Sequence, residues 1–362
     1  MTREFRIGNR IVSDDTNCFV IAEIGHNHQG SVAQCKEMIA IAKACGVDAV
    51  KLQKRDNRTL YTREMYDRPY DHENSYGRTY GEHREKLEFG WDAYVELKKH
   101  AEQFGLIFFA TAFDIPSADF LIKLEVPAIK IASGDITNTP LLEHVARSGI
   151  PIVLSTGGAQ MADVVRAYEV LTPITKAFTI LQCTSGYPAP FDQLNLRVIE
   201  SFRERFPDTV IGLSSHDNGI AMAMIGYALG ARIVEKHFTL NRSAKGTDHA
   251  FSLTPDGLRR MVRDLHRART AMGDGQKVAF PSETSPILKM AKKLVAARDI
   301  PAGTVLTRAD IAVRSPGDGL APYRLNEIVG LATRRALRPD EAFQITDLAE
   351  STAAARRTSS RQ

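Results

Sequence analysis

The stretch "IVEKHFTL", residues 233–240, places three ionisable side chains in the middle of a predicted buried strand. Its Ile, Val, Phe and Leu residues indicate an interior strand, yet Glu235, Lys236 and His237 stand at its centre. Burying such groups is costly unless they are paired or coordinated. Side chains two apart on a strand share a face, so Glu235 and His237 point together. Lys236 points the other way, and we expect it to pair with a carboxylate among outer helices.

Seven further β-rich runs precede this one, and most are followed by stretches with helical apolar spacing, such as residues 31–46 and 220–231. The eight runs are 18–25, 49–53, 106–113, 128–134, 151–157, 178–185, 210–216 and 233–239. Alternating strands and helices argue for parallel β/α units. Eight units within roughly 240 residues predict a TIM (β/α)8 barrel. A doubly wound open sheet is the alternative, but no glycine-rich dinucleotide fingerprint follows the first strand.

The rest of the chain divides by composition. The barrel domain is expected over residues 1–272 and a polar, turn-rich linker over 273–286. A short helix at 287–295 then opens a small β-rich domain spanning 287–350, with brief β segments broken by Pro and Gly. The last residues, 351–362, have the composition of a disordered tail.

The overall composition excludes several classes of protein. The 362 residues are 43% hydrophobic and 25% charged, and the net charge of +4 comes from dispersed bases, which disfavours nucleic-acid binding. An anionic small-molecule substrate is compatible with this charge. No apolar run approaches ~18 residues, and the N-terminus lacks the apolar core of a signal peptide. The four cysteines show no metal or redox spacing, so we expect buried, reduced thiols in a cytoplasmic protein.

Polar side chains stand at the C-terminal ends of the predicted strands, where TIM-barrel enzymes carry their active sites. A single polar strand end is usually a cap or a solvated terminus, but a set on eight successive strands favours one shared site. The set comprises Glu23, Lys51, Gln53, Thr111, Asp114, Lys130, Ser133, Ser155, Thr156, Ser185, Ser214, His216, Glu235 and His237.

Two lysines of this set, Lys51 and Lys130, are expected to face the barrel mouth. They repel each other unless an anion lies between them, which predicts a strongly anionic substrate. Ser/Thr-rich turns at the strand ends supply hydroxyl and N–H groups that can cradle phosphate. An alternative is a Schiff-base lysine of the class I aldolase type, for which Lys130 is the candidate.

His216 and His237 close neighbouring strands and predict a divalent metal site with open positions for substrate and water. Either histidine taken alone is more often a structural residue than a ligand. Glu235 shares a face with His237, so it either orients this ligand or binds a substrate hydroxyl. The long segment 55–90, rich in Tyr, His and Arg, is predicted to be a functional lid, because its aromatic content argues against disorder.

Several motifs, in order along nearly the whole chain, resemble the sialic acid synthase family. They are "IAEIGHNHQG" (21–30), "VKLQ" (50–53), "KIASGD" (130–135), "LQCTSGYP" (181–188), "GLSSHD" (212–217), "EKHFTL" (235–240) and "KGTDHAFSL" (245–253). The lid sequence at 66–94 resembles the animal-type branch of the family. "VAARDIPAGTVLT" (295–307) with "SPGDGL" (315–320) is similar to the family's antifreeze-like (SAF) domain.

The resemblance implies a transferase that condenses phosphoenolpyruvate with N-acetylmannosamine or its 6-phosphate. The product is a nine-carbon 2-keto acid, and phosphate leaves by C–O cleavage. The resemblance further implies a cytoplasmic homodimer in which the SAF domain of one subunit covers the active site of the other. A divalent metal, manganese with magnesium or cobalt as alternatives, is implied as the cofactor. The rival interpretations are a Schiff-base aldolase on the same barrel and a non-catalytic binding or scaffold protein.

The resemblance also implies roles for individual residues. His216 and His237 match the metal ligands, and Glu23 matches the acidic residue that handles a proton of water or of the intermediate. The phosphoenolpyruvate-binding positions are Lys51, Thr111, Lys130, Ser133, Ser185 and Ser214, and the sugar-binding positions are Gln53, Tyr187, Glu235 and Asp248. Two departures stand out: many bacterial members carry Asn at Ser185, and the usual Arg-Pro-Gly of the small domain is interrupted by Ser315. The arginine that reaches the partner's sugar is therefore Arg314, displaced by one residue, or is absent.

Overall fold

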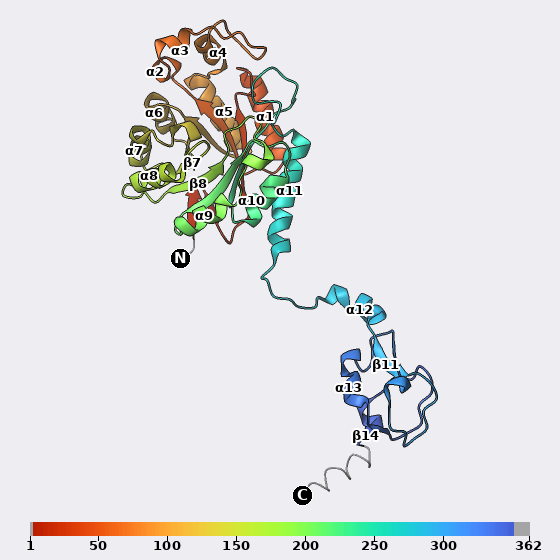
Figure 1. The fold of residues 1–362 in the computed structure, drawn as a ribbon. Helices are drawn as coiled ribbons and strands as arrows, with labels where there is room; N and C mark the ends of the chain where they lie inside the picture. Colours follow the sequence, from red (N-terminus) through yellow and green to blue (C-terminus); the bar gives the residue numbers. More distant parts are fainter. Residues whose placement is uncertain (1–2, 351–362) are drawn as a thin grey trace. The chain divides into compact units, whose positions relative to one another are not determined.

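The computed structural model describes residues 3–350, which form two compact units divided between Gly273 and Asp274 (Figure 1). The predicted disordered tail, residues 351–362, lies outside the described residues. No helix in the described part of the chain is long and apolar enough to cross a membrane.

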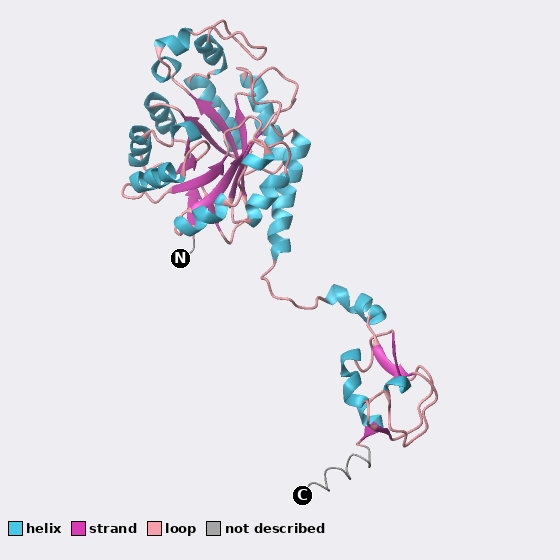
Figure 2. Cartoon of the chain, viewed as in Figure 1, coloured by secondary structure: helices cyan, strands magenta, loops and turns pink. Residues whose placement is uncertain are grey.

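The first unit is built on a closed barrel of eight parallel strands, in the order β10-β3-β4-β5-β6-β7-β8-β9 (Figure 2). This confirms the expected TIM barrel. The strands are β3 (Phe19–Gly25), β4 (Ala49–Lys54), β5 (Ile107–Ala112), β6 (Ile129–Ile131), β7 (Ile152–Ser155), β8 (Phe178–Cys183), β9 (Val210–Ser215) and β10 (Ile233–His237).

A helix follows each barrel strand and covers its outer face. These helices are α1 (Val32–Ala44), α5 (Trp91–Gln103), α6 (Ile115–Lys123), α7 (Thr139–Arg147), α8 (Met161–Leu171), α9 (Val198–Arg205), α10 (Ala221–Ala228) and α11 (Pro255–Met272), with short 3-10 turns at Ser133–Asp135 and Phe191–Gln193. Asp114, one of the polar strand ends, caps α6: its carboxylate accepts from the Ser117 N–H at 2.7 Å and the Asp56 N–H at 2.9 Å. Asp114 is therefore a helix cap.

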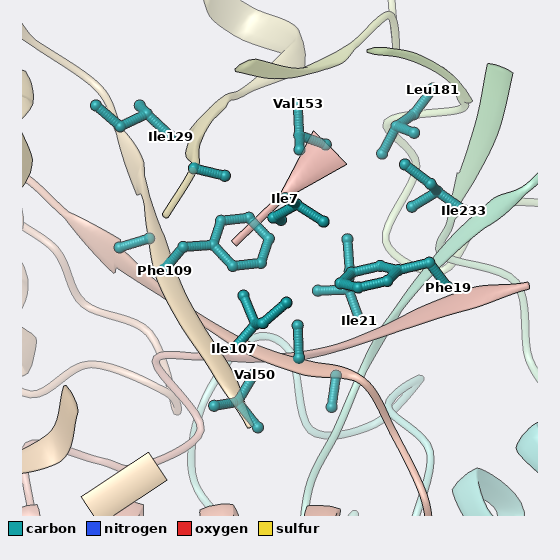
Figure 3. Packing of buried hydrophobic residues seen from close by; sticks show 14 of the residues in the cluster. Ile7, Phe19, Ile21, Val50, Ile107, Phe109, Ile129, Val153, Leu181 and Ile233 are labelled. Carbon is teal, nitrogen blue, oxygen red and sulfur yellow. The ribbon is translucent and has the colours of Figure 1, made fainter. Parts of the chain in front are cut away.

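A hairpin that the sequence patterns did not predict, β1 (Glu4–Ile7) with β2 (Arg10–Ser13), precedes the barrel. Its Ile7 is fully buried and lies among Phe19, Ile107 and Ile233, as Figure 3 shows. Each of these three residues begins its strand. The hairpin therefore packs against the N-terminal end of the barrel, and the carboxyl ends of the strands remain available for a site.

The segment expected to be a lid, residues 55–90, is ordered and contains α2 (Asn57–Leu60), α3 (Arg63–Asp67) and α4 (Tyr80–Leu87). It is attached to the loop after β10, where the Tyr76 hydroxyl donates to the Lys245 carbonyl at 2.6 Å. The Gly246 N–H donates to the Asn74 side chain at 2.9 Å. These contacts link the segment to the loop that carries Asp248.

The second unit has its own core of ten buried residues around Phe343 and Leu294. Its elements are α12 (Thr284–Met290), α13 (Leu325–Ile328), β11 (Lys293–Ala296) paired with β12 (Ile311–Arg314), β13 (Ala332–Thr333) paired with β14 (Leu348–Ala349), and 3-10 turns at Pro281–Glu283, Arg308–Asp310, Pro322–Arg324 and Ile345–Asp347. The helix expected at 287–295 is partly wrong: it ends at Met290, and β11 begins at Lys293 because Leu294 and Ala296 alternate into this core.

Candidate active site

A polar cavity of about 440 Å³ opens at the carboxyl ends of the barrel strands. Two of the polar strand ends do not line it: Asp114 caps α6, and the Thr156 hydroxyl donates to the Leu181 carbonyl at 2.9 Å. The cavity is lined by every barrel residue for which the resemblance implied a role: Glu23, Lys51, Gln53, Thr111, Lys130, Ser133, Ser185, Tyr187, Ser214, His216, Glu235, His237 and Asp248. The remaining predicted residue, Arg314, lies on β12 of the second unit, where it forms an ion pair with Asp340 at 2.9 Å. The structure thus gathers the barrel residues at one site, and their individual roles stay predictions.

A β-bulge in β3 lies next to Glu23, whose side chain lines this cavity. The register between β3 and β4 shifts between Glu23 and Gly25, and Gly25 has a positive φ of 53°. A Cβ at Gly25 would stand 3.2 Å from both the Gln53 amide nitrogen and a Glu23 carboxylate oxygen. Gln53 itself donates to that same oxygen of Glu23 at 2.8 Å. Glycine therefore permits the close approach of these two side chains.

Lys51 is the centre of a buried charge cluster. Its ammonium lies 2.7 Å from the Glu23 carboxylate and 3.9 Å from the Glu235 carboxylate, and it donates to the Thr111 hydroxyl at 2.9 Å. Lys130 instead donates to the Ser155 hydroxyl and to the Ile131 carbonyl. The protein's own carboxylates therefore offset part of the lysine charge. The sequence pattern predicts only a bound anion in this role.

Burial and these charges shift the pKa values of the two carboxylates in opposite directions. Burial raises the pKa of Glu23 to about 7, against the opposing attraction of Lys51. Burial also acts to raise the pKa of Glu235, but the attraction of Lys51 and Lys130 outweighs it and holds that pKa below its usual value. Glu23 is thus the carboxyl group that can exchange a proton near neutral pH.

Two hydroxyls and a backbone amide form a cradle beside the lysines. The Gly157 N–H donates to the Ser133 hydroxyl at 2.9 Å. A Cβ at Gly157 would collide with the hydroxyls of Ser133 and Ser185. Because both hydroxyls line the cavity, they and the ammonium of Lys130 are available to an anionic ligand.

The imidazoles of His216 and His237 face each other with ring centroids 5.2 Å apart. His216 donates from Nδ1 to the Thr184 carbonyl at 2.8 Å, so Nδ1 is occupied as a donor and Nε2 is the nitrogen left for a ligand. Burial works against the charged form of His216, but contacts with the Cys183 thiol and the Thr184 carbonyl raise its pKa above the ordinary value. Burial lowers the pKa of His237 to about 3, so its ring is neutral at pH 7, and its Nδ1 is buried without a hydrogen-bond partner. Neutral imidazoles with free nitrogens are the form that binds metal ions.

No group of three or more His, Cys, Asp or Glu side chains within residues 3–350 is arranged to hold a metal ion. The histidine pair therefore offers two protein ligands. Aromatic rings flank the pair: Tyr187 lies 4.3 Å from the His216 ring and Phe251 lies 5.0 Å from the His237 ring, between centroids.

Lys236 has a different partner from the one expected. It faces away from the cavity, as the alternation predicts, but its ammonium contacts Asp217 in the loop directly after β9 and not a carboxylate on an outer helix. The ammonium lies 2.9 Å from the Asp217 carboxylate and donates to the Asp217 carbonyl at 2.7 Å. Both side chains are buried, so the pair ties β10 to the residue that follows His216.

Several cavity residues were not among the predicted site residues. They are His26, Arg55, Arg84, Phe113, Ala132, Gly134, Ser155, Cys183 and Thr247. Ser155 was noted as a polar strand end, and Arg55 and Arg84 belong to the lid segment whose arginine content the sequence displays. Their approach to the cavity depends on tertiary packing. All four cysteines are buried and unpaired, as expected.

The barrel, its polar mouth and the separate small β unit define a class of TIM-barrel enzyme that carries a C-terminal SAF domain. Residues 38–277 match the model of the NeuB family, and residues 293–349 match the SAF domain. The chain belongs to the NeuB family. It is therefore an enzyme of the sialic acid synthase type.

Individual relatives agree with this assignment. The chain is 41% identical over 335 residues to N-acetylneuraminate-9-phosphate synthase from Homo sapiens, which covers 92% of this chain and 93% of the human protein. It is 33% identical to N,N'-diacetyllegionaminic acid synthase from Legionella pneumophila, over 86% of this chain and 89% of that protein. A crystal structure of N-acetylneuraminic acid synthetase from Leptospira borgpetersenii superposes with a TM-score of 0.69, at 30% identity, over 79% of this chain and 96% of that one.

Proposed function

We propose that this enzyme condenses phosphoenolpyruvate with N-acetylmannosamine or its 6-phosphate to give a nine-carbon 2-keto acid and inorganic phosphate. The observation that carries the proposal is the combination, in one cavity, of two buried lysines, a carboxyl group with a pKa near neutrality and a pair of facing histidines. The lysines suit an anionic enol phosphate, and the carboxyl group suits proton transfer. The histidine pair suits an aldehyde that has to be polarised.

Phosphoenolpyruvate is assigned to the part of the cavity that the two lysines line. Lys51 and Lys130 provide charge-assisted contacts for carboxylate and phosphate oxygens. Thr111, Ser133, Ser185 and Ser214 add hydroxyls from neighbouring strand ends, and the close approach of Gly157 to two of these hydroxyls supports the cradle. Serine at position 185, where many bacterial members carry Asn, supplies a shorter donor to the same cradle.

The reaction joins C3 of phosphoenolpyruvate to the aldehyde carbon of the open-chain sugar, whose C=O π bond breaks to leave an alkoxide. Water then adds at C2 and releases one proton, which balances the proton that the alkoxide takes up to become a hydroxyl. The C2–O bond to phosphate breaks, and phosphate departs with the proton of the new C2 hydroxyl as C2 becomes the keto carbon. Glu23 accepts a proton from this water, a role that its pKa of about 7 supports. Gln53, Tyr187, Glu235 and Asp248 hold the sugar. Gln53 is held in place by its hydrogen bond to Glu23, which brings the sugar contact and the proton acceptor together.

His216 and His237 are proposed to hold a divalent metal, manganese in preference to magnesium or cobalt. The neutral His237 ring and the His216 ring, whose Nδ1 is held as a donor to Thr184, fit such an ion. When bound, the ion would act as a Lewis acid on the sugar's aldehyde oxygen. The Thr184 carbonyl orients His216, and the Asp248 carboxylate, 3.5 Å from His237 Nδ1, faces the second ring.

The enzyme is further proposed to act as a homodimer in which the SAF domain of one subunit covers the barrel mouth of the other, with Arg314 reaching the sugar. Exposed apolar side chains at Ile287, Leu288 and Met290 of α12 support burial against a second copy of the chain. The unpaired cysteines support a reducing, cytoplasmic compartment.

The test is phosphate release from phosphoenolpyruvate against a panel of hexosamines and their 6-phosphates, with product masses measured in parallel. Release should require both a hexosamine and a divalent metal, and chelation should abolish it. Borohydride trapping addresses the aldolase rival: a covalent adduct at Lys130 together with chelator-resistant turnover would replace our proposal. Absence of any hexosamine-dependent phosphate release would favour the non-catalytic rival.

A further inference from the structure

Two arginines enter the cavity from the lid segment and are not used by the chemistry described above. Arg55 directly follows β4 and is only 7% exposed, and Arg84 lies on α4. His26 stands between them: a guanidinium nitrogen of Arg55 lies 3.2 Å from its Nε2, and one of Arg84 lies 3.3 Å from its Nδ1.

This arrangement leaves hydrogen-bond donors in excess. Burial, reinforced by the two nearby guanidinium groups, lowers the pKa of His26 well below its ordinary value, so its ring is neutral. A neutral imidazole has one lone pair and one N–H. Only one of the two arginines can therefore donate to His26, and the other faces an N–H. A buried guanidinium without an acceptor is costly, so binding a ligand that carries hydrogen-bond acceptors is favourable here.

Positive charge also exceeds negative charge among the ion pairs at this end of the cavity. Glu88 lies 3.9 Å from Arg55 and is shared with Lys54, which approaches it to 3.1 Å. Arg84 has no carboxylate within ion-pair distance among residues 3–350, and it contacts the Tyr80 hydroxyl at 3.0 and 2.8 Å. Glu88 thus serves both Lys54 and Arg55, and Arg84 is left to the longer-range attraction of Asp248 in the same cavity, so a largely buried guanidinium without an ion pair among the described residues favours a bound anion.

The two arginines lie on the side of the cavity that holds Gln53, a proposed sugar-binding residue, and not beside the two lysines. Arg55 donates to the side-chain amide oxygen Oε1 of Gln53 at 2.8 Å, and the Gln53 side-chain amide nitrogen in turn donates to Glu23, which pairs with Lys51. The hydrogen-bond series runs from Lys51 through Glu23 and Gln53 to Arg55. A sugar held at Gln53 therefore has the lysine cluster on one side and the arginine pair on the other.

We propose that Arg55 and Arg84 bind the phosphate of a hexosamine 6-phosphate, so that this enzyme selects the phosphorylated acceptor over the free sugar. The inference rests on the proposed function and names its acceptor. A phosphate monoester carries nearly two negative charges and several acceptor oxygens, which match two forked guanidinium groups. The phosphate oxygens would accept hydrogen bonds from the arginine that faces the N–H of His26.

The test compares N-acetylmannosamine 6-phosphate with N-acetylmannosamine, both in turnover with phosphoenolpyruvate and in calorimetric binding without it. The wild-type chain should prefer the phosphorylated sugar by at least about tenfold in kcat/KM and in affinity. Arg84→Gln should reduce that preference at least about tenfold, and Arg84→Lys should restore part of it. Arg78→Gln, an exposed arginine of the same lid outside the cavity, is the matched control and should leave the preference unchanged.

Three outcomes would overturn the inference: equal or better use of the free sugar by the wild-type chain, an equal loss with both sugars in Arg84→Gln, or a rise confined to the KM for phosphoenolpyruvate. The last would mean that the arginines bind the other substrate. Failure of the proposed function gives a distinct result, because preferential binding of the phosphorylated sugar without condensation would support the phosphate site while refuting the reaction.

Discussion

The ammonium of Lys51 lies 2.7 Å from the carboxylate of Glu23, and both side chains are buried at the mouth of the barrel. The pair comes from adjacent strands whose register matches Glu23 with Lys51. It connects the group assigned to proton transfer with a group assigned to the anionic substrate. Binding of an anion at Lys51 would compete with Glu23 for the ammonium, so the proton affinity of Glu23 is expected to rise when phosphoenolpyruvate binds.

Replacing either lysine with alanine should weaken phosphoenolpyruvate binding selectively. Each substitution removes a charge-assisted contact, and we expect the KM for phosphoenolpyruvate to rise about 10- to 100-fold for Lys51→Ala and Lys130→Ala. The KM for the sugar should change much less. Steady-state kinetics with each substrate varied in turn measures this, with the exposed Lys99→Ala as control. Parallel increases in both KM values would refute the assignment of the lysines to the anion.

Replacing His237 with alanine should reduce metal affinity without unfolding the barrel. The substitution removes one of the two proposed metal ligands at the open end of the barrel, so activity at limiting manganese should fall at least about tenfold and recover partly at high metal concentration. Metal titrations of chelator-treated protein measure the shift. His144→Ala is the control, because His144 lies on α7 with its ring against Asp119. Equal metal dependence in His237→Ala and the wild type would exclude His237 as a ligand.

The buried pair of Lys236 and Asp217 should be important for stability. Lys236→Met leaves the Asp217 carboxylate buried without its cation, which typically costs about 3–5 kcal/mol, whereas the double variant with Asp217→Asn should recover part of this loss. Urea unfolding followed by the fluorescence of Trp91, the chain's single tryptophan, reports on the barrel. Lys176→Met removes an exposed ion pair with Asp208 and should change stability by about 0–1 kcal/mol. A similar small change in Lys236→Met would contradict the proposed importance of the pair.

Periodicity predicted the barrel and much of its mouth. Strand alternation correctly placed Glu235 and His237 in the cavity and Lys236 outside it, because residue spacing along a strand fixes the face. The partner of Lys236 was not predictable in this way, since Asp217 becomes its neighbour only through the pairing of β10 with β9.

The arginine pair at the cavity illustrates the same limit. His26 and Arg84 are 58 residues apart, and their contact depends on the folding of the lid segment into helices. The hairpin that packs against the N-terminal end of the barrel was also missed, because two strands of four residues provide little periodic signal.

A chain ending at Gly273 should fold into a stable barrel with poor activity. The first unit has its own core, and the second has a separate one around Phe343, so neither core depends on the other for its hydrophobic contacts. We expect circular dichroism and thermal unfolding to show a cooperative transition in the truncated protein, and its KM for the sugar to rise. Full turnover at low sugar concentration would show that the SAF domain is not needed to cover the site.

Arg314 provides a test of whether the SAF domain acts across a dimer. Its ion pair with Asp340 involves side chains that are 57% and 62% exposed, and exposed pairs contribute little, so Arg314 can exchange this partner for a sugar. A guanidinium donates to an N-acetyl carbonyl, and mannose lacks that acceptor. Arg314→Ala should therefore impair the use of N-acetylmannosamine more than that of mannose, whereas the exposed Arg308→Ala should not discriminate between them.

Mixing subunits then determines which chain supplies the arginine. Arg314→Ala and Glu23→Gln should each be nearly inactive with N-acetylmannosamine at low concentration. If Arg314 reaches the partner's barrel, each mixed dimer regains one site that combines an intact Glu23 with an intact Arg314. Random exchange of equal amounts makes half of the dimers mixed, so about a quarter of wild-type activity should return. Recovery is measured after subunit exchange, and exchange is verified by mass. Verified exchange without recovery would place Arg314 in its own subunit's site or in none.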